Sequence, residues 1–382
     1  IARYLAQEEN DVVVVDHSSE LTRKIMDTLE VKAVNGFASE PAILEQAGAA
    51  DADLLIAVTQ ADEVNMVACQ IAHSLFDVTT KIARIRKQGY LDPKWGNLYT
   101  RDNMPIDVII SPEKEVAKAV SGRLRVPGAF EMISLVEDKV KLAGVRCNED
   151  CPVVNTPLRQ LTQLFPELNV VVVGIVRDHE NIIPAADDQL VAGDEVYLVV
   201  DSTHVQRAMS VFGHDEKEAR RIVIFGGGNI GLFLAQQIEE EHPTVNIKVV
   251  EAEKITAEST ARNLRHSVVL RGDVFDPEIL EEANVPSAEA VIAVTNDDET
   301  NILASLLAKR FGTERAITLI NNTTYSPLIT SLGIDVVVSP RAITVSTILQ
   351  HVRRGRIKAV HSLVDGFGEV IEAEILETSG LT

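Results

Sequence analysis

The chain has 382 residues, of which 46% are hydrophobic and 24% are charged, an ordinary balance for a globular protein of two or three domains. Its formal net charge of −21 argues against nucleic-acid binding, because an acidic surface repels phosphate backbones, and only 4% of its residues are aromatic. No apolar run approaches the roughly 18 residues that span a bilayer, so we expect no membrane-spanning helix.

Cysteine is sparse, with only Cys69, Cys147 and Cys151 present. This odd count does not suggest a disulfide framework and fits a reducing cytosol. Structural zinc needs four ligands, and no second Cys/His pair lies near Cys147 and Cys151. We interpret the cysteines as small buried or loop residues, with a metal or redox role as the less favoured alternative.

The N-terminal residues predict an amphipathic helix that runs into a strand ending at Asp16. Because the chain starts at Ile1 within this helical pattern, we expect its start to be cut into a larger unit. Asp16 then stands at the end of a strand, where a carboxylate can contact a ligand or simply face solvent.

A long stretch of the chain occurs twice. The segment GFASEPAILEQAGAADAD from Gly36 aligns with GDVFDPEILEEANVPSAE from Gly272, and LLIAVTQADEVNMVACQIA from Leu54 aligns with AVIAVTNDDETNILASLLA from Ala290. Further along, IDVIISP aligns with IDVVVSP. Since these matches keep the same order, the chain holds two copies of one domain.

Each copy alternates short β-branched runs with helical patterns, which predicts a doubly wound, parallel, Rossmann-like α/β fold. Between the copies, alternating patterns and one helical stretch near Leu158–Leu164 predict a small α+β domain, and a similar pattern begins again after the second copy. We therefore expect four domains: Rossmann-like domains at residues 1–126 and 220–352, a small α+β domain at 127–213, and a truncated second small domain at 357–382. In the second copy the expected strands are Arg221–Phe225, Ile247–Glu251, Ser267–Leu270, Ala290–Val294, Ala316–Ile320 and Ile334–Val338.

A G-x-G-x-x-G motif follows the first strand of the second copy and precedes a helix, with Glu251 at the end of the next strand. This context is typical of dinucleotide binding: glycines allow a tight turn, a close approach to pyrophosphate and close helix packing. A strand-end carboxylate accepts from ribose hydroxyls and repels a 2′-phosphate, which favours NAD or an adenine nucleotide over NADP. A purely structural glycine turn is the alternative. The motif consists of Gly226, Gly227, Gly228, Asn229, Ile230 and Gly231.

Asp16 is the matching acid of the first copy, and its glycine loop would lie before Ile1. We expect the intact protein to have such a loop; without it, the first site should bind nucleotide poorly.

The end of the fourth strand carries Thr59-Gln60 in one copy and Thr295-Asn296 in the other, at the edge that lines the ligand crevice of such sheets. Thr59-x-x-Asp62 and Thr295-x-x-Asp298 also read as helix capping boxes, and both roles are compatible. Two further positions differ between the copies: Gly272-Asp273, where a carboxylate can accept from adenine, replaces Gly36-Phe37, and Leu319 replaces Arg84, which can pair with phosphate.

Catalysis needs an acid or base near the cofactor, and no repeated histidine pattern, metal-binding histidine pair, G-x-S-x-G elbow or Walker lysine loop is present. We therefore expect nucleotide sensing and not turnover. An NAD-dependent oxidoreductase, or a ligand-gated regulator of another cation transporter, remains the alternative.

These motifs, in tandem order and with the small domain carrying AGDEVYLVV, resemble RCK domains, the regulators of potassium conductance. The arrangement is similar to the tandem RCK regulatory subunits of Trk potassium-uptake systems, apart from the first glycine loop and the short second small domain. The resemblance implies a non-enzymatic, cytosolic homo-oligomeric ring, a dimer or tetramer, that lies on the inner membrane through a channel subunit of the TrkH or TrkG type.

The resemblance also implies that NAD(H) and ATP or ADP bind the Rossmann-like domains and gate the pore. Carried over by position, the contacts are Asp16, Thr59, Gln60 and Arg84 in the first copy, and Gly226–Ile230, Glu251, Thr295 and Asn296 in the second. The helix from Glu113 to Arg125 is either a transmitting or dimerising element or a plain connector.

Overall fold

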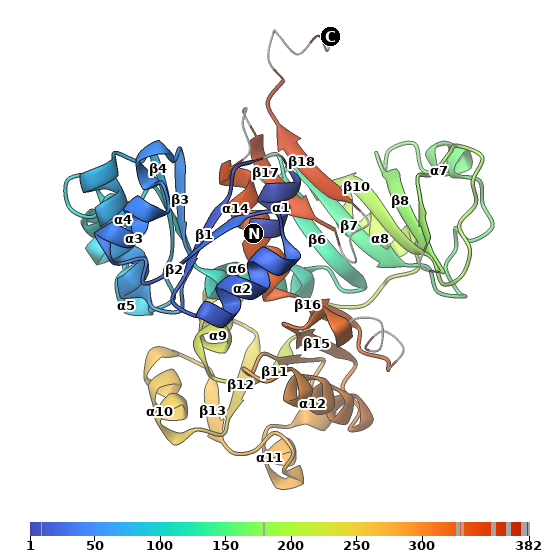
Figure 1. Cartoon of the computed structure of the whole chain (residues 1–382). Coiled ribbons are helices and arrows are strands. Elements are labelled where there is room, and N and C mark those ends of the chain that lie inside the picture. Colours follow the sequence, from blue (N-terminus) through green and yellow to red (C-terminus); the bar gives the residue numbers. More distant parts are fainter. Residues whose placement is uncertain are drawn as a thin grey trace. The chain divides into compact units, whose positions relative to one another are not determined.

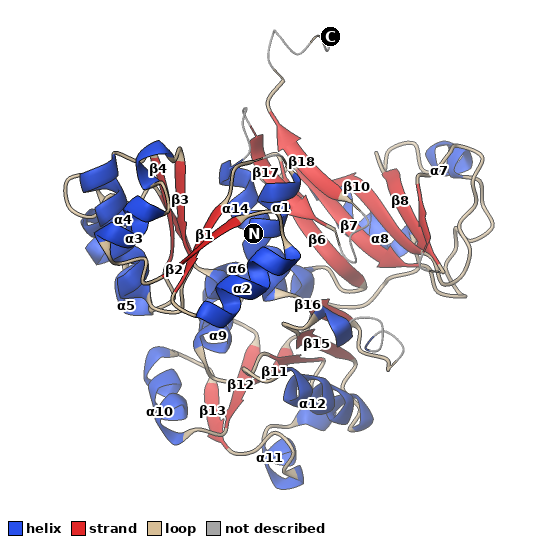
Figure 2. Cartoon of the chain, viewed as in Figure 1, coloured by secondary structure: helices blue, strands red, loops and turns tan. Residues whose placement is uncertain are grey.

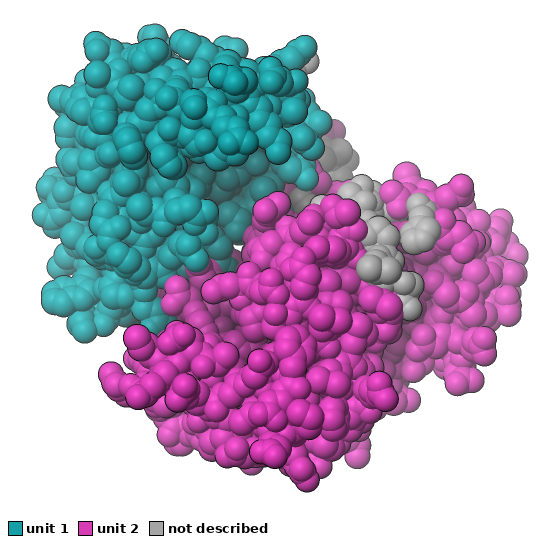
Figure 3. Space-filling view, turned by 60° about the horizontal axis from the view of Figure 1, so that its bottom comes forward, with its two compact units in different colours: residues 1–112, 344–355 teal, residues 113–343, 356–382 magenta. Residues whose placement is uncertain are grey.

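The computed structural model describes residues 1–8, 10–178, 180–325, 329, 332–352, 357–363, 368–375 and 380. The chain forms two compact units (Figure 3). Unit 1 comprises residues 1–112 and 344–355, and unit 2 comprises residues 113–343 and 356–382.

Unit 2 contains a parallel six-stranded sheet in the order β13-β12-β11-β14-β15-β16 (Figure 1). The chain starts at the centre, moves outward to β13 and returns to the other side of β11, as the doubly wound fold requires. Every expected strand of this copy lies within two residues of an observed one. The strands are β11 (Arg221–Phe225), β12 (Asn246–Glu251), β13 (Val268–Arg271), β14 (Ala290–Ala293), β15 (Arg315–Leu319) and β16 (Val336–Val338).

Helices connect these strands and bury apolar faces against them. The β14 residues are buried on both faces, which explains the continuous apolar run in the sequence. The connecting helices are α9 (Asn229–Glu241), α10 (Lys254–Asn263), α11 (Pro277–Glu282) and α12 (Asp298–Arg310).

Unit 1 repeats these elements, but its strands form two separate parallel sheets, β1-β2 and β3-β4-β5. The counterparts of β1 and β3 in unit 2 are β12 and β14, which flank β11, and no described strand of unit 1 takes the place of β11. Three of the four β3 residues are half-buried. The elements are α1 (Ala2–Gln7), β1 (Val13–Asp16), α2 (Ser19–Thr28), β2 (Lys32–Asn35), α3 (Pro41–Gln46), β3 (Leu54–Ala57), α4 (Asp62–Phe76), β4 (Thr80–Arg84), α5 (Gln88–Leu91), η2 (Pro93–Tyr99) and β5 (Val108–Ile110).

The two helices that follow the repeats are exchanged between the units. Helix α6 (Pro112–Arg125) follows the first repeat, yet Val116 and Val120 pack in unit 2 against the core of the β11 sheet. Helix α14 (Pro340–Val352) follows the second repeat, yet Ile348 packs in unit 1 with Ile82 and Ile110. The β11 sheet and the β3-β4-β5 sheet are thus each covered by a helix that follows the other repeat, and α6 is more than a connector.

The small domain in unit 2 is an antiparallel five-stranded sheet in the order β6-β7-β10-β8-β9 (Figure 2). Helix α7 (Leu158–Leu164) matches the expected helical stretch, whereas β9 and α8 lie outside the sequence prediction. Cys147 and Cys151 are buried in its core. The strands are β6 (Ala129–Leu135), β7 (Val140–Arg146), β8 (Val171–Arg177), β9 (Glu180–Ile182) and β10 (Glu195–Asp201), with helix α8 at Val205–Val211.

The C-terminal hairpin of β17 (Ile357–Ser362) and β18 (Glu369–Ala373) is antiparallel and belongs to the same unit. Leu363 and Val370 pack with Tyr197 on the face of the small-domain sheet. The Glu372 carboxylate accepts from the backbone N–H of Val136 at 2.9 Å, which ties the hairpin to the turn between β6 and β7.

In the part of the chain that the structure describes, no helix has both the length and the apolar character needed to cross a bilayer.

Candidate nucleotide-binding sites

The glycine motif forms the turn between β11 and α9. Gly226 has φ of +105°, and a Cβ there would come within 3.0 Å of the backbone at Val294 and Thr295. A Cβ on Gly231 would lie 1.9 Å from the Gly226 carbonyl oxygen, so only glycine lets α9 start this close to β11. By contrast, a Cβ on Gly228 would meet nothing within 4 Å. Gly228 therefore presents open backbone at the start of a helix, which suits an approaching phosphate.

Glu251, at the end of β12, is fixed beside this turn. One of its carboxylate oxygens accepts from the Gly227 N–H at 2.7 Å, and the other accepts from the Glu253 N–H at 2.8 Å. From α10, the buried Thr260 hydroxyl donates to the Gly227 carbonyl at 2.6 Å. The Gly227 peptide is thus held on both sides, and the carboxylate keeps lone pairs at the place where a ribose would lie.

The carboxyl end of the sheet brings the other expected residues of the second copy to the same edge. Gly272 donates its N–H to the Glu251 carbonyl at 3.0 Å, and Thr295 follows β14 next to Gly226. Asn296 is exposed beside it. Asp273 is also exposed, and its carboxylate accepts from the Phe275 N–H at 2.9 Å, which closes a local turn. These residues of the second copy therefore lie at the carboxyl end of one parallel sheet.

The predicted capping boxes are wrong in both copies. Helix α4 begins at Asp62 with Ala61 as an N-cap that makes no side-chain bond, and α12 is capped by Asp297, whose carboxylate accepts from the Thr300 N–H. The reason is that each threonine stands three residues before its helix begins, outside the capping position.

Thr59 and Thr295 are held instead by a buried asparagine one turn into the helix. The Asn65 side-chain oxygen accepts from the Thr59 N–H at 2.8 Å and from its hydroxyl at 2.7 Å, and the amide nitrogen donates to the carbonyls of Thr59 and Arg84. Asn301 makes the same contacts with Thr295 and Leu319, with the same distances to within 0.1 Å. This asparagine therefore joins the ends of the fourth and fifth strands in each copy.

The two acids of the repeated D-E-x-N motif anchor the loop after the fifth strand. The Asp62 carboxylate accepts from the N–H groups of Arg86 and Lys87, and Asp298 accepts from those of Asn321 and Asn322. The neighbouring glutamates, Glu63 and Glu299, accept from the hydroxyls of Tyr90 and Tyr325. Sequence reasoning gave these residues no site role, although their identity in both copies was a usable signal for a shared polar clamp.

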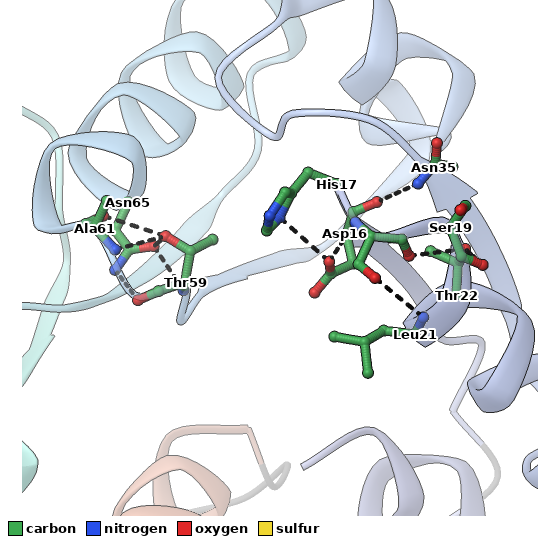
Figure 4. Close-up of polar contacts among 10 residues, drawn as sticks. Asp16, His17, Ser19, Leu21, Thr22, Asn35, Thr59, Ala61 and Asn65 are labelled. Carbon is green, nitrogen blue, oxygen red and sulfur yellow. Dashed lines mark hydrogen bonds and ion pairs between the residues drawn. The ribbon is translucent and has the colours of Figure 1, made fainter.

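The expected site residues of the first copy lie in two separate groups, one around Asp16 and one around Thr59. Asp16 closes a turn by accepting from the Ser18 N–H at 2.8 Å, and its carbonyl accepts from Gly36 and Asn35 (Figure 4). His17 and Phe37 stack beside it, with ring centroids 5.5 Å apart.

The second group lies at the ends of β3 and β4, around Thr59 and Asn65 (Figure 4). The Arg86 guanidinium donates to the Gln60 side-chain oxygen at 3.2 Å, and Asn65 holds the Arg84 carbonyl at 2.9 Å. Asp16 and Thr59 stand at the ends of β1 and β3, which belong to different sheets. Their counterparts in unit 2, Glu251 and Thr295, stand at the ends of β12 and β14, which flank β11.

No group of three or more His, Cys, Asp or Glu side chains with metal-binding geometry occurs among the described residues.

Comparison with known proteins identifies related domains along most of the chain. The TrkA-N domain family matches residues 1–112 and 222–340, and the TrkA-C domain family matches residues 142–213. The Trk system potassium uptake protein TrkA of Azorhizobium caulinodans is 52% identical over 381 residues, which is 100% of this chain and 83% of that protein. The protein of the same name from Halomonas elongata is 41% identical over 373 residues, or 98% of this chain and 80% of that protein.

Solved structures with the same fold are more distant in sequence. The GsuK RCK domain has a TM-score of 0.64 at 18% identity, covering 91% of this chain and 72% of that chain. A GsuK channel bound to NAD has a TM-score of 0.65 at 18% identity, covering 91% of this chain and 60% of that chain.

Proposed function

The chain belongs to the TrkA family of potassium-uptake proteins, and we propose that it is a nucleotide-sensing regulatory subunit that binds NAD(H) and adenine nucleotides and gates a membrane potassium channel. The observation that carries this proposal is the glycine turn of unit 2. It has open backbone at Gly228, a helix N-terminus behind it, and the Glu251 carboxylate fixed beside it.

The chemistry of this turn favours NAD(H), ATP or ADP over NADP. The N–H groups at the start of α9 suit a pyrophosphate, and Glu251 accepts from ribose hydroxyls but repels a 2′-phosphate. Further contacts come from the neighbouring strand ends, and the first site is completed by basic side chains absent from the second. The proposed ligand contacts are Asp16, Thr59, Gln60 and Arg84, and Gly226–Gly231, Glu251, Gly272, Asp273, Thr295 and Asn296.

The domain boundaries proposed from the sequence are Rossmann-like RCK-N domains at 1–126 and 220–352, and RCK-C domains at 127–213 and 357–382. We propose a homo-oligomeric ring, a dimer or tetramer, on the cytosolic face of the inner membrane. A potassium channel subunit of the TrkH or TrkG type would hold it there. A ligand can shift the equilibrium between two conformations of such a ring only if it binds the two conformations with different affinities.

We propose no enzymatic turnover. Among the described residues, the groups fixed at the crevice of the second copy are backbone N–H groups, the carboxylates of Glu251 and Asp273, and the amide and hydroxyl side chains of the strand ends. These groups suit the binding and orientation of a nucleotide, and the proposal assigns none of them a role in proton transfer.

The test is potassium flux into vesicles that contain the reconstituted channel subunit and the purified chain. We expect NADH and ATP to change the flux in a saturable manner, with the NADH absorbance constant. A Gly228→Ala variant should lose the response to the ligand of the second site. Flux that ignores both nucleotides, or steady NADH consumption, would show that the proposal is wrong.

A further inference from the structure

The loop after the fifth strand differs strongly between the two copies. In the first copy, residues 86–107 contain Arg86, Lys87, Lys94 and Arg101 against Asp92, Asp102 and Asp107, and they hold the only tryptophan of the chain. In the second copy, residues 321–335 contain no lysine or arginine. In a chain of net charge −21, this local excess of positive charge stands out.

Hydrogen bonds anchor the first part of this segment, the aromatic-basic loop (residues 86–101), to the rest of unit 1 and to itself. Asp62 binds its first N–H groups, and the Tyr99 hydroxyl donates to the Tyr90 carbonyl at 3.0 Å, which joins α5 to η2. Tyr90, Leu91 and Tyr99 pack on the core of unit 1. The loop is therefore a preformed surface.

Its outer side combines aromatic rings with ammonium groups. Trp95 is 55% exposed, and it lines an open groove of about 420 Å³ together with Lys87, Gly89, Tyr90 and Leu98. The Lys94 ammonium lies 5.4 Å from the Trp95 ring centroid, and the Lys87 ammonium lies 6.0 Å from that of Tyr90.

The lysines of the loop also make exposed ion pairs, Lys87 with Glu63 at 2.5 Å and Lys94 with Asp92 at 2.7 Å. The side chains of both lysines are more than 60% exposed in these pairs. Exposed pairs of this kind contribute little, so the ammonium groups can exchange these carboxylates for another anion.

We propose that the aromatic-basic loop binds the surface of an anionic bilayer directly. Tryptophan and tyrosine favour the boundary between headgroups and acyl chains, and lysine and arginine are attracted by anionic lipids. The inference goes beyond the proposed function, because it requires neither a nucleotide nor the channel subunit.

A protein partner is the competing occupant, and the loop fits it less well. Protein hot spots lie in desolvated pockets enclosed by a rim of contacts that excludes water. Here the aromatic groove is open, and charged side chains border its rings. This arrangement suits a headgroup layer, where the rings reach the acyl boundary and the charges stay hydrated.

The single tryptophan makes the test direct, because Trp95 is the fluorophore that reports on the loop. The full chain is titrated with vesicles of phosphatidylglycerol and phosphatidylcholine, and with vesicles of phosphatidylcholine alone. We expect a blue shift of Trp95 emission and quenching by brominated acyl chains with the anionic vesicles only. High salt should reverse both effects.

A charge-neutral variant then measures the contribution of the basic side chains. Lys87→Gln, Lys94→Gln and Arg101→Gln together should weaken vesicle partitioning about 100-fold, since each cation contributes about fivefold. The control Arg23→Gln, Lys24→Gln, Arg310→Gln removes the same charge from exposed positions outside the loop and should retain partitioning within about twofold. Unfolding midpoints of both variants verify that they fold.

Three results would overturn the proposal. The first is Trp95 emission that does not respond to anionic vesicles, and the second is an equal loss in both triple variants. The third is a response that appears only when the vesicles contain the channel subunit, which would assign the loop to a protein partner. Since lipid-only vesicles lack that subunit, failure here would leave the gating proposal standing.

Discussion

The two Rossmann-like repeats share a polar clamp, formed by Asn65 in the first and Asn301 in the second, but they differ at the centre of the sheet. Asn65 and Asn301 make matching bonds to the threonine and to the end of the fifth strand. In unit 2 this clamp stands beside a glycine turn on the central strand β11, whereas unit 1 has separate sheets and no described counterpart of β11. Both regions therefore build the same clamp at the ends of two neighbouring strands, and in the second region the clamp stands beside the glycine turn.

The regions also differ in charge at the crevice edge. The first has Arg84, Arg86 and Lys87 where the second has Leu319, Asn321 and Asn322. Yet Asp62 and Asp298 hold the backbone of these loops in the same way. The backbone scaffold is thus constant, while side chains that can reach a ligand vary.

The largest expected effect is that of Gly231→Ala. The added Cβ would lie 1.9 Å from the Gly226 carbonyl oxygen, so α9 must move away from β11. We expect a loss of about 3 kcal/mol in the free energy of unfolding of unit 2, measured by denaturant titration, together with loss of nucleotide binding there. Unchanged stability would show that the close approach of α9 is not required.

Removal of the clamp should affect both regions alike. Asn65→Ala and Asn301→Ala each delete an amide that makes four hydrogen bonds. We expect a loss of about 2–3 kcal/mol in each case, because buried backbone groups lose their partners. The exposed Asn296→Ala is the control and should change stability by less than about 0.5 kcal/mol. A neutral effect in either copy would refute the shared clamp.

Gly228→Ala separates binding from folding. Its Cβ meets no atom within 4 Å, and alanine at the N-cap of α9 should cost no more than about 1 kcal/mol of stability, while the methyl group occupies the space proposed for phosphate. We expect nucleotide affinity at the second site to fall about 30-fold, roughly 2 kcal/mol, in calorimetric titrations. Unaltered affinity would place the phosphate elsewhere.

Glu251→Ala tests nucleotide choice at the second site. Loss of the carboxylate should weaken NADH binding about tenfold and reduce the discrimination against NADPH, since the repulsion of a 2′-phosphate disappears. Competition titrations of NADH and NADPH measure both effects. Asp16→Ala provides the matched change in the first copy. If both variants changed the same titration phase equally, the proposal that each copy has its own nucleotide site would be wrong.

The smallest effect concerns protonation beside the loop of the first copy. The hydrogen bond from Lys87 lowers the pKa of Glu63. Because the folded-state pKa is lowered, the stabilising contribution exists above the ordinary glutamate pKa and is lost as the pH falls through the lowered value. Lys87→Gln should move the Glu63 titration, followed by NMR, back toward the ordinary value, and an unmoved titration would contradict the pairing.

Local patterns were sufficient for the strands and for the glycine turn, because β-branched runs and a short motif encode them directly. The exchange of α6 and α14 could not be predicted, since an amphipathic helix does not specify which of two similar sheets it covers. The capping boxes failed for a similar reason. Asp62 and Asn65 bind backbone groups about 20 positions away, at Arg84 and Arg86, and spacing along one helix does not reveal such partners.

Calorimetric titration of the purified full chain with NADH, beside the Gly228→Ala variant, tests the central claim most directly. The account predicts saturable binding to the wild-type chain, a constant absorbance of the reduced nicotinamide, and a binding phase about 30-fold weaker in the folded variant. No binding by the wild-type chain, or equal binding by both, would contradict the assignment of the glycine turn of unit 2 as a nucleotide sensor.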